Sequence, residues 1–315
     1  MIYLINKHQL NNIIEKIQAT YSSYGYRRED DKVIFGKVKS PSQTKFFQEN
    51  GTITFKKILF PNNLDVQADK EDKIVLLGIN PCDNNALQIF YKQFQKSNLI
   101  IDKKNLFVFV SECKQSKYCF CEYFDGQKIQ NYDLYLQKED DDKFTLFVGS
   151  KKGKIIADKI PLKKSTERKP REIKRPNNNF SDNPFSAMGQ KEKYKDFWIH
   201  ISNNCFGCGS CSVVCPLCFC FRQEFGNDLN GDSKTKLCWD SCFNKEFSEI
   251  QNRFDLRPKN VDRLYNWYHH KFVRGPHELG VPLCTGCGRC MKACPANLNQ
   301  KNIMEALEEK KNDER

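Results

Sequence analysis

Two stretches of the chain repeat one cysteine spacing, CFGCGSCSVVCP at residues 205–216 and CTGCGRCMKACP at residues 284–295. Both follow the pattern Cys-x2-Cys-x2-Cys-x3-Cys-Pro. Three thiolates at every third position converge from a tight loop on three irons of a cubane, so the pattern is typical of [4Fe–4S] ligation. The sequence therefore predicts a ferredoxin-type domain with two [4Fe–4S] clusters.

The fourth cysteine of each stretch is expected to serve the cluster of the other stretch. Glycines between the first three cysteines let the loop turn tightly, whereas the fourth cysteine follows on a helical turn that points away. The predicted ligand sets are Cys205, Cys208, Cys211 and Cys294 for one cluster, and Cys284, Cys287, Cys290 and Cys215 for the other. Zinc sites usually pair two Cys-x2-Cys knuckles, so two copies of this pattern favour iron–sulfur over zinc.

The first 150 residues show the pattern of an α/β domain. Short apolar runs predict strands at residues 33–35, 53–60, 74–79 and 106–110. Between the last two, residues 83–94 place their apolar side chains on one helical face, with Asp83 expected as the N-cap. Strand, helix and strand at this spacing form a βαβ unit, whose two strands should be parallel.

Four further cysteines should gather at one edge of this sheet. Cys82 follows the strand at 74–79, Cys113 follows the strand at 106–110, and Cys119 and Cys121 come from the next loop. Parallel strands end at the same edge, where α/β folds place their sites, and Cys82 also falls at a helix N-terminus that favours thiolate. The four thiols are either ligands of a third metal centre, with Fe–S as the first choice, or free redox-active thiols.

The distribution of charge and of apolar residues predicts a linker and a cellular location. The net charge is +12, but residues 151–175 alone contain eleven Lys/Arg and three acidic residues, which accounts for +8. We expect residues 151–195 to be a basic exposed linker. Its charged residues are either simply solvated or form a docking surface. No apolar run approaches the ~20 residues of a membrane span, and no signal peptide is evident, so a cytoplasmic protein is expected.

Residues 196–299 contain most of the cysteines. The 68 residues between Cys215 and Cys284 exceed what a minimal ferredoxin needs, and a helix is expected around residues 261–272. The predicted fold class is therefore an α/β N-terminal domain (1–150) followed by a mainly helical ferredoxin-type dicluster domain (196–299). A charged helical tail is expected at residues 300–315.

The other cysteines have no role that spacing can decide. Cys218 and Cys220 neighbour a predicted ligand, so they either line the cluster pocket or join Cys242 in a further centre. The sequence contains no nucleotide-binding glycine motif after a strand, no P-loop and no nucleophile elbow, and we expect no catalytic residue.

Several segments together resemble one family, the iron–sulfur subunits of anaerobic sulfite reductase and of cytoplasmic [NiFe] sulfhydrogenases, in which the subunit is called β. They are GINPCD at 78–83, EC at 112–113, CFC at 119–121, CPLCFC at 215–220, WDSC at 239–242 and the second cysteine stretch. The resemblance covers residues 74–298, some two-thirds of the chain. The family pattern includes Cys82, Cys113, Cys119 and Cys121, which favours a third cluster, whereas Cys238 has no counterpart in it.

The resemblance implies an electron-transfer protein without its own catalytic site. It would relay electrons between a flavoprotein that oxidises NAD(P)H and a hydrogenase or a sulfite or sulfur reductase subunit. Two other functions are possible. The first is a zinc-bearing nucleic-acid-binding module, which the basic net charge favours, although that charge is confined to one linker. The second is a self-contained sulfur or disulfide reductase.

Overall fold

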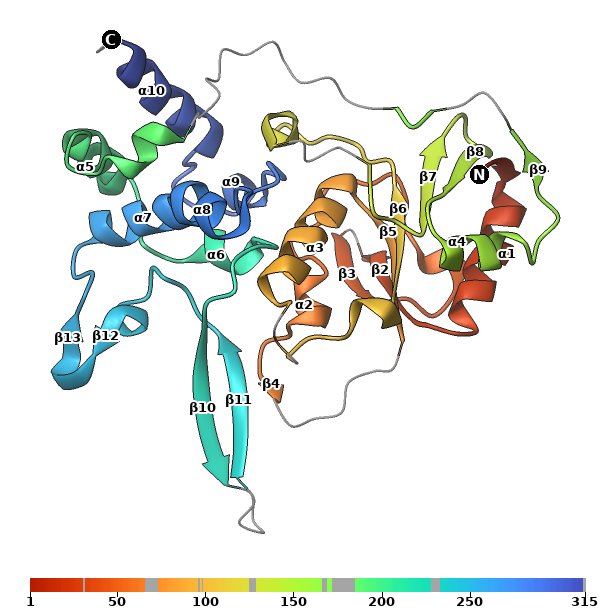
Figure 1. The fold of residues 1–315 in the computed structure, drawn as a ribbon, viewed down its shortest axis with the longest axis horizontal. Coiled ribbons are helices and arrows are strands. Elements are labelled where there is room, and N and C mark those ends of the chain that lie inside the picture. Colours follow the sequence, from red (N-terminus) through yellow and green to blue (C-terminus); the bar gives the residue numbers. More distant parts are fainter. Residues whose placement is uncertain are drawn as a thin grey trace. The chain divides into compact units, whose positions relative to one another are not determined.

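A computed structural model describes the chain except for residues 31, 66–72, 96, 98, 125–128, 166–168, 172–184, 228–232 and 314–315. Figure 1 shows the order of its helices and strands. The chain divides into two compact units. The first comprises Met1–Phe60, Ala68–Lys174 and Thr285–Cys287, and the second comprises Pro61–Gln67, Arg175–Cys284 and Gly288–Arg315.

The first unit is built on an eight-stranded mixed sheet. Its strands are β1 Ile2–Asn6, β2 Ser22–Glu29, β3 Lys32–Lys37, β5 Ile74–Ile79, β6 Leu106–Ser111, β7 Leu134–Lys138, β8 Lys143–Val148 and β9 Lys163–Lys164. Their spatial order is β3-β2-β5-β6-β7-β8-β1-β9, and the neighbours from β2 to β7 pair in parallel. Strands β5 and β6 are buried throughout, which explains their continuous apolar runs.

The helices of this unit are α1 Lys7–Gln18, α2 Lys56–Leu59, α3 Pro81–Gln93 and α4 Lys151–Ala157. Strand β5, helix α3 and parallel strand β6 confirm the predicted βαβ unit. The prediction for the N-cap is wrong, since Asn80 occupies that position and Pro81 begins the helix. Asp83 is instead buried in the first turn of the helix, where its carboxylate accepts a 2.6 Å hydrogen bond from the Tyr26 hydroxyl.

The predicted strand at residues 53–60 is also wrong. This segment forms the short helix α2, and Phe55, Leu59 and Phe60 are buried. Their spacing of four and five positions brings them to one side of a helical turn. A short apolar run fits a buried strand and a buried helix equally well, so its periodicity could not decide between them.

Residues 151–195 were expected to be an exposed basic linker, but the first part of this stretch forms a helix and a strand. Residues 151–157 form α4, and β9 pairs with β1 at the edge of the sheet. Helix α4 buries Gly153, Ile156 and Ala157, so it is amphipathic although three of its seven residues are lysines. Residues 166–168 and 172–184 of the expected linker lie outside the described part of the chain.

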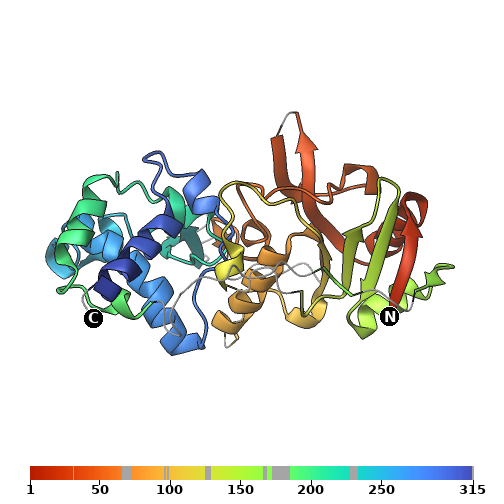
Figure 2. The same cartoon turned by 90° about the horizontal axis from the view of Figure 1, so that it is seen from above.

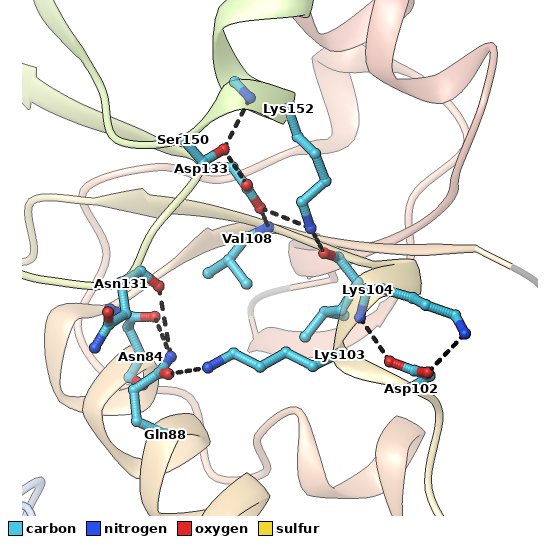
Figure 3. A network of polar contacts seen from close by, with 12 residues as sticks. Asn84, Gln88, Asp102, Lys103, Lys104, Val108, Asn131, Asp133, Ser150 and Lys152 are labelled. Carbon is cyan, nitrogen blue, oxygen red and sulfur yellow. Dashed lines mark hydrogen bonds and ion pairs between the residues drawn. The ribbon is translucent and has the colours of Figure 1, made fainter.

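A polar network fastens the start of α4 to the sheet (Figure 3). The buried carboxylate of Asp133 accepts from the backbone N–H of Val108 at 2.7 Å and from the Ser150 hydroxyl. The Lys152 ammonium lies 3.6 Å from the same carboxylate. Ser150 also caps α4, accepting from the Gly153 N–H at 3.0 Å. These contacts order the first turn of the stretch.

The second unit combines helices with two small sheets, whereas the sequence predicts a mainly helical domain. Its helices are α5 Lys195–Asn203, α6 Ser210–Val214, α7 Asn260–His269, α8 Gly275–Leu279, α9 Arg289–Lys292 and α10 Gln300–Asp313, with the π-helical turn η7 His270–Arg274 continuing α7. Its strands are β4 Leu64–Asp65, β10 Phe221–Asn227, β11 Ser233–Trp239, β12 Glu249–Ile250 and β13 Phe254–Asp255, arranged as β10-β11-β4 and β12-β13.

The helix expected near residues 261–272 is present as α7 and η7, and the expected tail helix is present as α10. Helix α10, dark blue in Figures 1 and 2, lies beside the 3-10 turn Ser186–Gly189 and buries Ile303, Met304 and Leu307. Among the helices that the structure describes, none has the length and apolar composition needed to cross a membrane.

Candidate metal centres

The first cysteine loop depends on two glycines with left-handed backbones. Gly207 has φ 63° and Gly209 has φ 71°. A Cβ on Gly207 would lie 2.9 Å from Asn260 Oδ1, and one on Gly209 would lie 2.7 Å from Ser241 Oγ. Side chains are therefore excluded at both positions by conformation and by space. The resulting tight turn presents Cys205, Cys208 and Cys211 from one short loop.

All four cysteines of the first predicted set line a single pocket. They are Cys205, Cys208, Cys211 and Cys294. The rest of the lining is largely apolar and includes Phe243, Leu264, Trp267 and Tyr268. Burial raises the pKa of Cys211 to about 12 and also raises that of Cys205. Four soft sulfur donors in an apolar pocket fit an iron–sulfur cluster.

One finding on single metal ions applies to both units. Among the described residues, no three His, Cys, Asp or Glu side chains form a group that could hold one. A zinc ion with ~2.3 Å Zn–S bonds needs sulfurs within ~4 Å of one another, whereas a four-iron cubane separates its thiolates more widely.

The second cysteine loop has the same backbone form. Gly286 has φ 64° and Gly288 has φ 75°. Cys284 and Cys290 belong to the second unit, but the tip of the loop, Thr285–Cys287, groups with the first unit. There Gly286 accepts a 2.9 Å backbone hydrogen bond from the N–H of Phe120.

The buried ammonium group of Lys271 interacts with Cys215 of the first stretch and with Cys284 of the second. The Lys271 ammonium, on η7, lies 3.3 Å from Cys215 Sγ and donates to the carbonyl of Leu283 at 3.1 Å. Burial by itself would lower the pKa of Lys271, but the charges of Cys215, Cys218 and Cys284 raise it well above its ordinary value. One cysteine from each stretch thus lies within electrostatic range of the same side chain.

Two of the four N-terminal cysteines follow the ends of parallel strands: Cys82 comes three residues after β5 and Cys113 two residues after β6. Cys82 is in the first turn of α3, and Cys121 is buried. Burial and the nearby Cys119, Asp83 and Glu112 raise the pKa of Cys113 to about 12.

One asparagine connects three parts of this N-terminal group. The Asn50 side chain donates to the Cys287 carbonyl at 2.9 Å and lies 3.8 Å from Cys119 Sγ. Its Oδ1 accepts from Asn80 at 2.6 Å and from Cys82 Sγ at 3.5 Å. Cys82, Cys119 and the tip of the second cysteine loop are thereby brought together around Asn50.

The remaining cysteines fall into two environments. Cys218 and Cys220 follow Cys215, and Asp240 donates its backbone N–H to the Cys220 carbonyl at 2.8 Å. A hydrogen bond between Cys220 and Cys242 is the main reason that the pKa of Cys220 falls to about 7 and that of Cys242 rises. Cys238 instead donates to Asn63 Oδ1 at 2.9 Å and does not line the cluster pocket.

Three polar residues beside the thiols were not identified from the sequence: Asn50, Asn260 and Lys271. Asn260 donates to the carbonyl of Cys205 at 2.7 Å and fastens the first loop to the start of α7. For the two asparagines no sequence signal was available. For Lys271 the sequence did contain a signal. It lies seven residues after Leu264, a spacing that places both residues on the same buried face of the α7–η7 helix.

Comparisons with known proteins agree with this chemistry. A family model described as a 4Fe–4S dicluster domain matches residues 204–298. The sulfhydrogenase 2 subunit beta of Pyrococcus furiosus is 27% identical over 286 residues, covering 84% of this chain and 82% of that protein. No solved structure matches the chain. The chain thus carries a 4Fe–4S dicluster domain and is similar over most of its length to a sulfhydrogenase β subunit, which confirms the resemblance to the iron–sulfur subunit family that its motifs indicate.

Proposed function

We propose that this protein is the electron-transfer iron–sulfur subunit of a multi-subunit redox complex. The observation that carries the proposal is the pocket lined by Cys205, Cys208, Cys211 and Cys294. Three of these thiols come from one tight loop and the fourth from a distant stretch, which is the arrangement that closes a cubane site in two-cluster ferredoxins. Bound clusters of this type accept and donate single electrons, and the protein's part is to bind them and set their potentials.

The ligands of the two clusters are assigned as the sequence predicts. Cys205, Cys208, Cys211 and Cys294 bind one cluster, and Cys284, Cys287, Cys290 and Cys215 bind the other. The pocket supports the first set. For the second set, support comes from Lys271, which interacts electrostatically with both Cys215 and Cys284.

Cys82, Cys113, Cys119 and Cys121 bind a third iron–sulfur cluster in this proposal. The support is their position at one edge of the sheet and their proximity to the second cysteine loop. Cys119 Sγ lies 3.9 Å from the carbonyl oxygen of Cys287, a predicted ligand of the second set. This contact lies within the first unit, to which both residues belong.

The partners are proposed by analogy. The relative is named as a subunit of a sulfhydrogenase, so we infer that this chain also works beside a catalytic partner, which is a hydrogenase or a sulfite or sulfur reductase. A flavoprotein that oxidises NAD(P)H is proposed as the other electron partner, in the cytoplasm. Catalysis is assigned to those partners and not to this chain.

Iron and acid-labile sulfide analysis of the anaerobically purified chain tests the proposal. About eight irons per chain are expected from two cubanes and about twelve from three. EPR of the dithionite-reduced protein should show reduced [4Fe–4S] signals. A protein that binds zinc in place of iron, or that contains no labile sulfide after anaerobic reconstitution, would overturn the assignment.

A further inference from the structure

A buried lysine lies among the thiols of the second predicted set. Lys271 is 3% exposed and follows Leu264, Trp267 and Tyr268 on the buried stripe of α7 and η7. A lysine at such a position loses most of the hydration of its ammonium group, which is costly unless nearby negative charge compensates.

The contacts of Lys271 hold its ammonium in a fixed place. Its Nζ donates to the Leu283 carbonyl at 3.1 Å, and its own backbone carbonyl accepts from the Leu283 N–H at 2.9 Å. The ammonium also lies 5.1 Å from the centre of the Trp267 ring. Leu283 directly precedes Cys284, so the backbone and the side chain of the lysine are both fastened to the start of the second cysteine loop.

No carboxylate compensates this cation within the described residues. Its Nζ contacts are the Cys215 sulfur at 3.3 Å, the Leu283 carbonyl and the Trp267 ring. The pKa of Lys271 is raised by Cys215, Cys218 and Cys284, which are all thiols. Two of these are predicted ligands of one cluster, and their thiolate charge exists in full only when the cluster is bound.

We propose that Lys271 raises the reduction potential of the cluster bound by Cys215 and Cys284, acting as a fixed positive charge beside its ligands. The inference rests on the proposed function. A cubane that accepts an electron becomes more negative by one charge, and a buried cation beside its thiolates stabilises that reduced form more than the oxidised form. Lys271 is thus a positioning and electrostatic residue that acts through the ligand sulfurs.

The test compares variants in which the charge at this position is removed or kept. Lys271→Met and Lys271→Gln remove it with similar side-chain length, and Lys271→Arg keeps it. Lys292→Met is the matched control, because Lys292 lies between Cys290 and Cys294 in the sequence but is exposed, so solvent screens its charge. Each protein is reconstituted anaerobically, its iron and sulfide are measured, and each cluster is titrated against potential by EPR.

For Lys271→Met with full iron content, the ratio of reduced to oxidised cluster at the wild-type midpoint should fall on the order of tenfold for one cluster. The other cluster should change less. Lys271→Arg should titrate close to wild type, and Lys292→Met should match it. Unchanged potentials in iron-replete Lys271→Met and Lys271→Gln would overturn the inference and leave the proposed function intact.

Cluster loss in a variant also decides the question. If both neutral variants lose iron while Lys271→Arg retains it and titrates close to wild type, the positive charge acts on the bound cluster, which supports the inference. If Lys271→Arg loses iron as well, the lysine matters for packing and the inference is wrong. An iron-free wild type would overturn the proposed function first, and the role of Lys271 with it.

Discussion

Among single residues, Cys294 gives the sharpest test of ligand exchange between the two cysteine stretches. It lines the same pocket as Cys205, Cys208 and Cys211, although about 80 residues of sequence separate it from them. Cys294→Ala should therefore remove about four irons and one EPR signal while the other cluster remains. Iron analysis and EPR of the reduced protein measure this.

Cys238→Ala is the control for that variant, because Cys238 is also buried in the second unit but bonds to Asn63 away from the pocket. Its iron content should equal that of wild type. Retention of both clusters in Cys294→Ala would contradict the assigned ligand sets.

His270, next to Lys271, should make the metal-free chain acid-sensitive. Burial, followed by the nearby Arg274, Lys271 and His269 charges, lowers the pKa of His270 to about 4. Between about pH 6.5 and 4 the unfolded chain therefore binds a proton that the folded chain does not, so stability falls as the pH falls through this window. His270→Gln should reduce that loss by on the order of 1–3 kcal/mol.

Urea unfolding of the metal-free protein at pH 7 and pH 4.5 measures the effect. His277→Gln is the matched control, because His277 lies on the next helix, α8, with an exposed side chain. The control should lose as much stability as wild type. Equal acid sensitivity of His270→Gln and wild type would show that His270 is not held neutral by the fold.

Among the elements, the second cysteine loop depends on Gly286. A Cβ there would lie 2.4 Å from the Phe120 carbonyl oxygen and 2.6 Å from the Cys121 nitrogen, and its φ of 64° disfavours other residues. Gly286→Ala should lower the free energy of unfolding by about 2 kcal/mol or more and reduce iron content. Thermal unfolding and iron analysis check both effects.

Gly226→Ala provides the comparison, because Gly226 in β10 has no atom of the described residues within 4 Å of its would-be Cβ, and its φ is not left-handed. That variant should unfold and bind iron as wild type does. A Gly286→Ala protein with wild-type stability would mean that the loop tip does not pack against Phe120 and Cys121.

A helix or strand was predictable from the sequence where its pattern of apolar residues fitted only one type of secondary structure. Strands β5 and β6 were found because their apolar runs are continuous and bounded, as in a buried parallel sheet. Helix α2 and the hairpin β10–β11 were missed. The first is too short to show a helical period, and the second carries mostly exposed polar residues, so neither has a clear apolar alternation.

For the molecule as a whole, the proposed function assigns three clusters to the chain. The four N-terminal cysteines belong to a unit with its own core, so their site should be separable from the dicluster domain. Cys119→Ala should lower the iron content from about twelve to about eight per chain and leave the two dicluster signals unchanged. Iron analysis with EPR redox titration resolves the loss.

Lys114→Ala, an exposed neighbour in the same loop, should leave all iron in place. A wild-type chain that binds only about eight irons, with no change in Cys119→Ala, would rule out the third cluster. The two dicluster assignments would not be affected by that result.

The sequence by itself determined the dicluster chemistry, since the ligand pattern is local. Within twelve residues it specifies the thiols, the glycines that turn the loop and the proline that ends it. Only the tertiary structure decided which remote groups join the thiols. Asn50 beside Cys119 and Cys287, and Lys271 beside Cys215, meet through the packing of distant segments, and contacts at such sequence separation leave no periodic trace along the chain.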